Sequence, residues 1–252
     1  MSQQTAEDIL DWRAAVENLV TEDDEPVDNF LSATLMRLLV TPLYDSWTPP
    51  PSEEAPGEKR RFMATANVGV FRTPYEPPVV PDMLLSLDIE TPHDWSARDK
   101  RSYFLWEFGK PPDVVVEIVS NTKGRELDEK LRHYARLDVS YYVVYDPHHW
   151  LMEDPLRVYE RGFGRRYRRR GDYNLPDVGL SLTLWEGVYE GEQGNWLRWL
   201  DSQGNLIPTG AECTTQASEC TTQASERATQ AEDRAAKLAA KLRELGIDPD
   251  EM

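Results

Sequence analysis

Cysteine is scarce in this chain of 252 residues, which contains only Cys213 and Cys220. Both lie in a polar repeat near the C-terminus. A structural zinc site needs four Cys or His ligands, and a disulfide framework needs several pairs of cysteines. The sequence therefore excludes a small protein that is stabilised by disulfides or by zinc.

Long apolar runs are also lacking. No apolar stretch approaches the roughly 20 residues that a membrane-spanning helix requires. The first residues, MSQQTAEDILDW, have neither the basic nor the apolar region of a signal peptide. We therefore expect a cytoplasmic protein with no membrane partner.

Basic residues are few, with 28 Lys and Arg against 45 Asp and Glu and a net charge of −17. This balance disfavours nucleic-acid binding, because such proteins neutralise phosphates with Lys and Arg. Positive charge is concentrated in residues 157–170, which hold seven arginines and one glutamate. We identify Arg165, Arg166 and Arg168 as candidate phosphate contacts. Equally, arginines on a strand can form a solvated edge that resists aggregation.

Apolar residues make up 40% of the chain, which supports a folded core. The composition predicts three parts: an acidic helical arm over 1–24, a folded domain over 25–210 and a heptad-repeat tail over 211–246. Within the domain, helical spacing of apolar residues predicts helices, and short apolar runs predict strands. The expected helices are 27–47 and 125–137, and the expected strands are 66–71, 79–89, 114–119, 141–146, 156–160, 165–169, 180–187 and 195–200. Strand, helix and strand over 114–146 predict a βαβ unit with parallel strands.

The tail repeats every seven residues from Ala211. One core position holds Thr214, Thr221, Ala228, Ala235 and Leu242, and the other holds Ala217, Ala224, Ala231, Leu238 and Leu245. Alternating spacings of three and four residues are typical of a coiled coil. The tail is therefore either a coil that joins chains into a homo-oligomer or a solvated helix.

Three residues form the candidate site: Asp82 at the start of a strand, Glu117 inside the apolar run VVVEIV, and Lys130 on the following helix. An acid in a buried strand is costly unless it is paired or binds metal. Carboxylates from neighbouring strands make a site of oxygen ligands that suits Mg²⁺ or Mn²⁺. A lysine on the crossover helix can reach across an apolar surface to this site.

Each of these residues also has a purely structural interpretation. Glu117 is a buried acid that an arginine or backbone amides could hold. Lys130 follows Glu126 by four residues, which favours a surface ion pair. Asp82 follows a proline and is compatible with a turn. Tyr134 is expected to belong to the core.

The segments around these residues resemble the Uma-type restriction endonuclease group of the PD-(D/E)XK nuclease superfamily. The resemblance covers roughly residues 25–210 and is most specific over 111–147. It is carried by PVDNFLSATLMRLLVTPLYDSW, VVPDML, KPPDVVVEIVSNTKGRELDEKLRHYARLDVSYYVVYDP and LTLWEGVYEG. The resemblance implies an α/β fold: a restriction-endonuclease-like core with a central mixed β-sheet flanked by helices, here followed by a C-terminal coiled-coil helix.

The resemblance also implies roles for the site residues. Asp82 and Glu117 match the two acids that bind metal, and Asp113 shares the Glu117 face as an auxiliary ligand or merely ends a loop. The usual lysine position is Val119 in this chain, a departure that puts catalysis in doubt unless Lys130 supplies the ammonium. The implied function is a Mg²⁺- or Mn²⁺-dependent endonuclease acting on DNA. The alternative is a catalytically inactive nuclease fold kept for binding or assembly.

Overall fold

The structure is a computed structural model that describes residues 29–52, 59–90, 101–120 and 126–244. The acidic arm expected over residues 1–24 lies outside the described residues. Contacts divide the chain into two units, Met1–Ile207 and Pro208–Met252. The sheets and the candidate site belong to the first unit, and one long helix belongs to the second.

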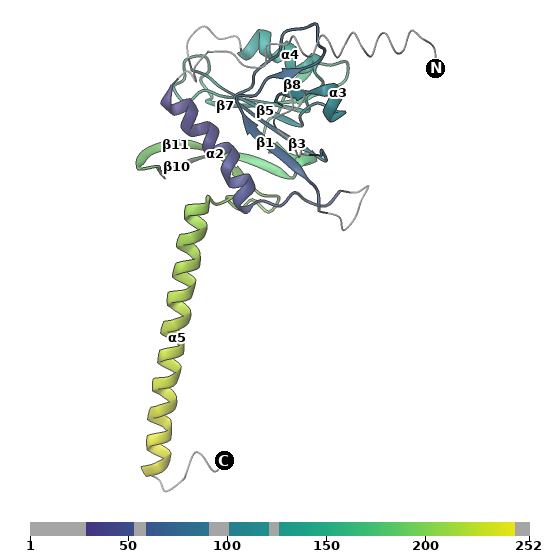
Figure 1. The fold of residues 1–252 in the computed structure, drawn as a ribbon. Coiled ribbons are helices and arrows are strands. Elements are labelled where there is room, and N and C mark those ends of the chain that lie inside the picture. Colours follow the sequence, from purple (N-terminus) through teal and green to yellow (C-terminus); the bar gives the residue numbers. More distant parts are fainter. Residues whose placement is uncertain (1–28, 53–58, 91–100, 121–125, 245–252) are drawn as a thin grey trace, which may run out of the picture. The chain divides into compact units, whose positions relative to one another are not determined.

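A six-stranded mixed sheet forms the centre of the first unit (Figure 1). Its strands are β1 (Phe62–Ala66), β3 (Met83–Leu87), β5 (Val114–Ile118), β6 (Tyr141–Tyr145), β7 (Leu156–Arg161) and β8 (Tyr167–Arg169). They lie in the order β1-β3-β5-β6-β7-β8. The pair β5–β6 is parallel, and all other neighbours in this sheet are antiparallel. The expected central mixed sheet is therefore confirmed.

A helical crossover connects β5 to β6, as the predicted βαβ unit requires. It consists of a π-helical turn, η2 (Glu126–Lys130), followed directly by helix α4 (Leu131–Arg136). The helix stops at Asp138, which adopts the left-handed conformation with φ 64°. The amide of Val139 then donates to the carbonyl oxygen of Tyr134 at 3.2 Å, as in a Schellman motif.

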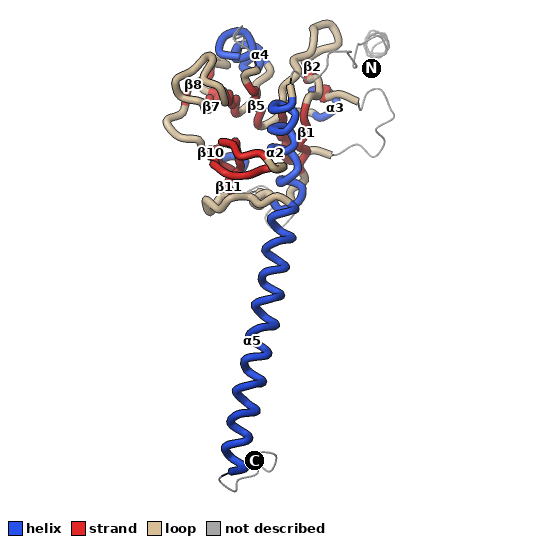
Figure 2. The backbone as a smooth tube through the Cα atoms, turned by 90° about the vertical axis from the view of Figure 1, so that its left-hand side faces the viewer, coloured by secondary structure: helices blue, strands red, loops and turns tan. Residues whose placement is uncertain are grey.

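One face of the central sheet is covered by helix α2 (Phe30–Ser46) and a small sheet. The small sheet has the order β11-β10-β9, from β9 (Asn174–Leu175), β10 (Leu180–Tyr189) and β11 (Glu192–Leu200), with a short 3₁₀ turn, η3 (Pro176–Val178). Figure 2 shows α2 beside β10 and β11. The indole of Trp199 donates to the carbonyl oxygen of Leu39 at 2.8 Å, which ties the small sheet to the helix.

The opposite face of the central sheet packs against α4 and a short parallel pair of strands. These strands are β2 (Val70–Phe71) and β4 (Tyr103–Phe104), and helix α3 (Leu105–Phe108) follows β4 directly. Side chains alternate along β5, so Val115 and Val119 point into this second apolar layer. Glu117 lies between them on the same face of the strand.

The strand expected over residues 66–71 is wrong as a single element. β1 ends at Ala66, and β2 begins only at Val70 in a different sheet. Between them, Asn67 adopts the left-handed conformation with φ 53°, which an extended strand cannot accommodate. A turn that the apolar pattern did not reveal therefore splits the segment.

The second unit contains helix α5 (Gly210–Glu244). Its start is a capping box: Oε2 of Glu212 accepts from the amide of Thr209 at 2.7 Å, and the amide of Glu212 donates to Oγ1 of Thr209 at 3.2 Å. The expected helical tail is therefore present as one continuous element. Within the described part of the chain, no helix has the length and apolarity that a membrane span needs.

Candidate active site

Strand pairing brings the two predicted acids together. β3 and β5 run antiparallel with Met83 opposite Val116. Continuing this register by one residue sets Asp82 opposite Glu117. Cα atoms of directly opposed residues are about 4.5–5.5 Å apart in antiparallel pairs. The two carboxylates, 35 positions apart in the sequence numbering, therefore start from neighbouring backbone positions.

Glu117 is fully buried, at 0% exposure, and both of its carboxylate oxygens are engaged. Oε2 accepts a hydrogen bond from Nζ of Lys130 at 2.7 Å, and Oε1 accepts one from the hydroxyl of Tyr134 at 2.5 Å. Lys130 and Tyr134 are four residues apart on one helical stretch, so their side chains project from the same face. The Lys130 side chain is 31% exposed and connects the buried acid with solvent.

Asp82 is half-buried at the start of β3. Its Oδ2 accepts a hydrogen bond from the backbone amide of Ile118 at 2.6 Å. Since Ile118 directly follows Glu117, this bond anchors the Asp82 carboxylate beside the buried acid. The arrangement holds two carboxylates and one ammonium at the same end of β5.

Burial raises the pKa of Glu117 from 4.5 to about 8, because the charged form loses its hydration. The positive charge of Lys130 opposes this shift in pKa, and the negative charge of Asp82 reinforces it. Burial also raises the pKa of Tyr134 well above 10, and the charge of Glu117 adds to that shift. Tyr134 therefore keeps its proton and acts as a hydrogen-bond donor to the acid.

The contact of Tyr134 with Glu117 is the site feature that the sequence analysis missed. Tyr134 is buried in the core, as expected, but its hydroxyl also reaches the acid. The signal that could have revealed it is the spacing of four residues from Lys130. Two side chains four residues apart on a helix project from the same face, so both can contact one residue of the sheet that this face covers. Here that residue is Glu117 on β5.

Val119 occupies the position at which the resemblance to the nuclease superfamily would place a lysine. Its side chain is buried in the apolar layer beneath α4, and its amide donates to the carbonyl oxygen of Tyr145 at 2.8 Å. Lys130 approaches Glu117 from the helix instead. An ammonium therefore contacts the acid despite the missing lysine.

Asp113, the candidate auxiliary ligand, has different partners. Nζ of Lys110 donates to both of its oxygens, at 2.7 and 3.0 Å, and the amide of Leu87 donates to Oδ2 at 2.7 Å. Asp113 precedes Glu117 by four residues, which is about 13 Å along a strand. The structure therefore places it at the other end of β5, away from the two acids.

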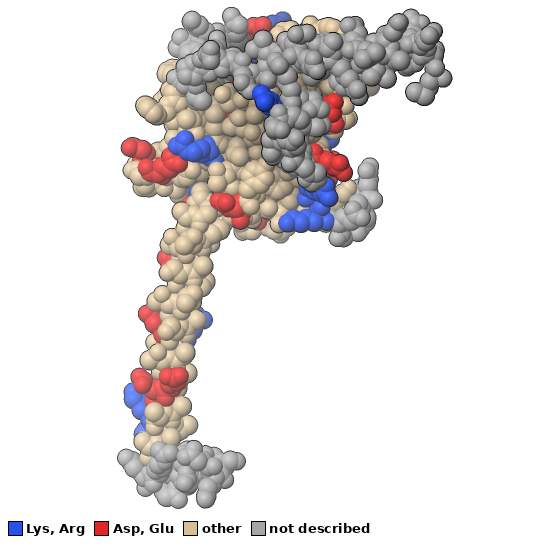
Figure 3. Space-filling view, viewed as in Figure 1, with Lys and Arg blue, Asp and Glu red and all other residues tan. Residues whose placement is uncertain are grey.

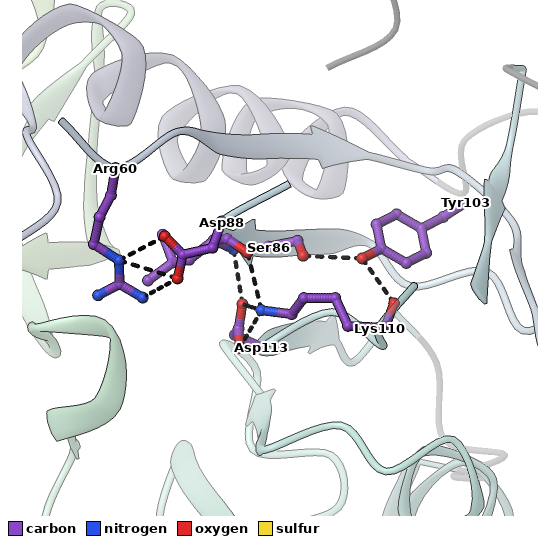
Figure 4. A network of polar contacts seen from close by, with 7 residues as sticks. Arg60, Ser86, Asp88, Tyr103, Lys110 and Asp113 are labelled. Atoms are coloured by element: carbon purple, nitrogen blue, oxygen red, sulfur yellow. Dashed lines mark hydrogen bonds and ion pairs between the residues drawn. The ribbon is translucent and has the colours of Figure 1, made fainter. Parts of the chain in front are cut away.

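Asp113 belongs to a polar network at that end of β3 and β5 (Figure 4). Lys110 also donates to the carbonyl oxygen of Leu87, and its own carbonyl oxygen accepts from the hydroxyl of Tyr103. Nearby, the guanidinium of Arg60 pairs with Asp88, and this pairing lowers the pKa of Asp88. These contacts indicate a structural role for Asp113, because its hydrogen bonds link the start of β5 to the end of β3.

The candidate phosphate-binding arginines lie on the hairpin of β7 and β8, at the edge of the central sheet. Nη2 of Arg165 lies 3.2 Å from a carboxylate oxygen of Asp138, and Nη2 of Arg168 lies 3.4 Å from Glu160. The Arg168 side chain is nevertheless 80% exposed, and Arg166 is also exposed. Exposed surface ion pairs are weak, so phosphate contact and a solvated edge both fit this arrangement.

The oxygen donors of Asp82 and Glu117 suit a hard divalent cation. Mg²⁺ is commonly held by one or two carboxylates, with water and substrate phosphate completing its shell. Among the residues that the structure describes, no group of three or more Asp, Glu, His or Cys side chains could hold a metal ion. A cation at this site would therefore depend on the carboxylate pair, backbone oxygens, water and substrate.

Comparison with known proteins gives one family. The family model Uma2, described as "Putative restriction endonuclease", matches residues 34–186. The matched region runs from α2 through most of β10 and includes Asp82, Glu117 and Lys130. No curated protein matches the chain.

Proposed function

Because the chain belongs to the Uma2 family, within the PD-(D/E)XK nuclease superfamily, we propose that it is a divalent-metal-dependent endonuclease that cleaves DNA. The observation that carries this proposal is the contact of buried Glu117 with Lys130, beside Asp82. A buried acid held beside a second carboxylate and an ammonium is a costly arrangement for stability alone. It is an arrangement suited to chemistry on a phosphodiester.

Asp82 and Glu117 would hold the cation, as Mg²⁺ or Mn²⁺ is held in oxygen-ligand sites. When bound, the ion would offset charge on the phosphate and make an attacking water more acidic. The hydrogen bond from the Ile118 amide fixes the position of Asp82, and Tyr134 fixes that of Glu117. Preorganised ligands of this kind avoid a reorganisation cost during the reaction.

Lys130 is proposed to stabilise the developing charge or to orient the attacking water. Its side chain is 31% exposed while Nζ donates to Glu117 at 2.7 Å, so the residue spans from the acid to the solvent that would deliver substrate. An ammonium near a transferring phosphoryl group stabilises negative charge that grows in the transition state. This role would make Lys130 the functional replacement for the lysine missing at position 119.

DNA is proposed as the substrate, with backbone contacts from Arg165, Arg166 and Arg168. Strand β8 lies three strands from β5 in the sheet, about 14 Å at the usual spacing. The phosphates of one duplex span that distance. Local positive charge at the hairpin would offset the net charge of −17 where the duplex binds.

The test is cleavage of supercoiled plasmid by the full chain with Mg²⁺, with Mn²⁺ and with a chelator. We expect nicked or linear product with a metal, none with the chelator, and none from Glu117→Gln. Gln keeps the size of the side chain and can bond to Lys130 and Tyr134, so this variant should retain its fold. Cleavage by Glu117→Gln at the wild-type rate would reject the proposal.

The second candidate is a nuclease fold that binds or assembles without cleaving. The valine at position 119 and the excess of acidic residues favour it. A chain of this kind would bind plasmid or partner without cutting it under any metal, and Glu117→Gln would bind as the wild type does. Metal-dependent cleavage that is lost in Glu117→Gln excludes this candidate.

A further inference from the structure

Helix α5 is a long element, and most of its described side chains are open to solvent. It spans 35 residues, and the side chains from Thr214 to Leu238 are all exposed. Leu238 is 61% exposed although it is a large apolar residue. Most helical stability in proteins comes from packing of one face, and the heptads over residues 211–238 supply such a face in α5. The helix therefore presents a repeated surface suited to packing against a partner.

The heptad seam contains residues that pack closely. Positions a and d hold Thr and Ala in the N-terminal half and gain Leu towards the C-terminus. At the two seam threonines, the hydroxyl of Thr214 donates to the carbonyl oxygen of Gly210 at 2.8 Å, and that of Thr221 donates to Ala217 at 2.9 Å. These hydroxyls are satisfied within the helix. Their methyl groups therefore remain available for contact with an apolar seam.

Charged side chains indicate both the partner and its direction. Figure 3 shows that charge on the visible side of α5 is concentrated in its C-terminal half. Arg227 occupies position g and Glu232 the following position e, five residues later. In a parallel pair, position g of one helix lies against the following position e of the other helix. Arg227 of each helix would therefore pair with Glu232 of its partner, which gives two such ion pairs. An antiparallel pair sets g against g and would bring Arg227 near Arg234.

We propose that the seam of α5 pairs with the same seam of a second copy of this chain, as a parallel, in-register, two-stranded coiled coil. Charge complementarity between Arg227 and Glu232 selects an identical helix as the occupant. This association is independent of whether the first unit cleaves DNA.

Neighbouring alanines provide a matched test of the seam. Ala235 lies at position a, whereas Ala236 lies at position b on an outer face of the coil. Ala235→Asp and Ala236→Asp have the same cost in helix propensity, so they differ only in the face that receives the carboxylate. The mass of the full-length chain in each form is measured by light scattering at micromolar concentration.

The wild type and Ala236→Asp should have the mass of a dimer. Ala235→Asp should raise the dissociation constant by more than about 100-fold, because it places two unpaired carboxylates in the seam. A monomeric wild type would overturn the proposal. So would equal masses for the two variants, whether both were dimers or both were monomers.

Direction is tested by a cross-link. Ala217→Cys is introduced at a d position of the full chain that also carries Cys213→Ser and Cys220→Ser, and the protein is oxidised mildly. Parallel, in-register helices place the two new thiols side by side, so most of the dimer should become disulfide-linked. A dimer that stays unlinked would contradict the parallel arrangement, because antiparallel helices separate these thiols by several turns.

Discussion

The hydroxyl of Tyr134 lies 2.5 Å from Oε1 of Glu117, and both side chains are fully buried. Lys130 holds the other oxygen of the same carboxylate at 2.7 Å. Two side chains on one helical face thus donate hydrogen bonds to both carboxylate oxygens of Glu117, which projects from strand β5. This contact makes Tyr134 a positioning residue for the candidate metal ligand.

Removing the Tyr134 hydroxyl should therefore impair the site more than the fold. For Tyr134→Phe we expect DNA cleavage or metal affinity to fall about 10- to 100-fold, as for other residues that orient metal ligands. Tyr167→Phe is the control, because its hydroxyl donates to the carbonyl oxygen of Val139 at 2.9 Å in the same aromatic cluster. Equal loss of activity in both variants would show that Tyr134 acts only through packing.

The two candidate aspartates should behave differently. Asp82→Asn should abolish cleavage, because it removes a charged ligand beside Glu117. Asp113→Asn should leave the rate of cleavage within a few-fold of the wild type and lower the free energy of unfolding by about 1–3 kcal/mol, through weaker bonds to Lys110. Cleavage rates and chemical denaturation of both variants check this. Loss of metal binding in Asp113→Asn would support the hypothesis that Asp113 is a metal ligand.

Metal binding should depend on pH below the pKa of Glu117, which burial raises to about 8. A metal ligand must lose its proton, so binding at lower pH releases one. We expect affinity for Mg²⁺ to rise about tenfold for each pH unit until the pH reaches that pKa, and then to level off. Titration calorimetry in buffers of different ionisation enthalpy measures the number of protons that are released when Mg²⁺ binds. Affinity that stays constant as the pH falls would refute this.

The arginine hairpin should contribute to DNA binding. Arg168→Gln should weaken binding and reduce the slope of log affinity against log salt by about 0.9, the value for one phosphate contact. Arg37→Gln is the matched control, because Arg37 is also an exposed arginine paired with a glutamate, Glu190. Fluorescence anisotropy of a labelled duplex at several salt concentrations measures both slopes. Identical slopes would identify the hairpin as a solvated edge.

Much of the fold follows from patterns along the chain. The apolar run with one acid, 114–119, predicted a strand covered on both faces, and β5 is fully buried. Alternation along that strand also predicted which side chains share the face of Glu117. These features are local, so sequence spacing is enough to reveal them.

Features that depend on tertiary contacts could not be predicted from sequence spacing. The helix expected over 125–137 begins as a π-helical turn, which changes the direction of its first side chains. Asp113 and Glu117 share a face, and the partners that give Asp113 a structural role, Lys110 and the amide of Leu87, are visible only in the structure. The contact between Tyr134 and Glu117 joins a helix to a strand and depends on how the crossover packs.

The central claim is that one divalent ion binds between Asp82 and Glu117. Crystals of the full chain soaked in Mn²⁺ would show this ion directly by its anomalous scattering. The account predicts a peak within coordination distance, about 2.1 Å, of an oxygen from each carboxylate, and no such peak in Glu117→Gln. A wild-type crystal with Mn²⁺ bound elsewhere and none between these two side chains would contradict it.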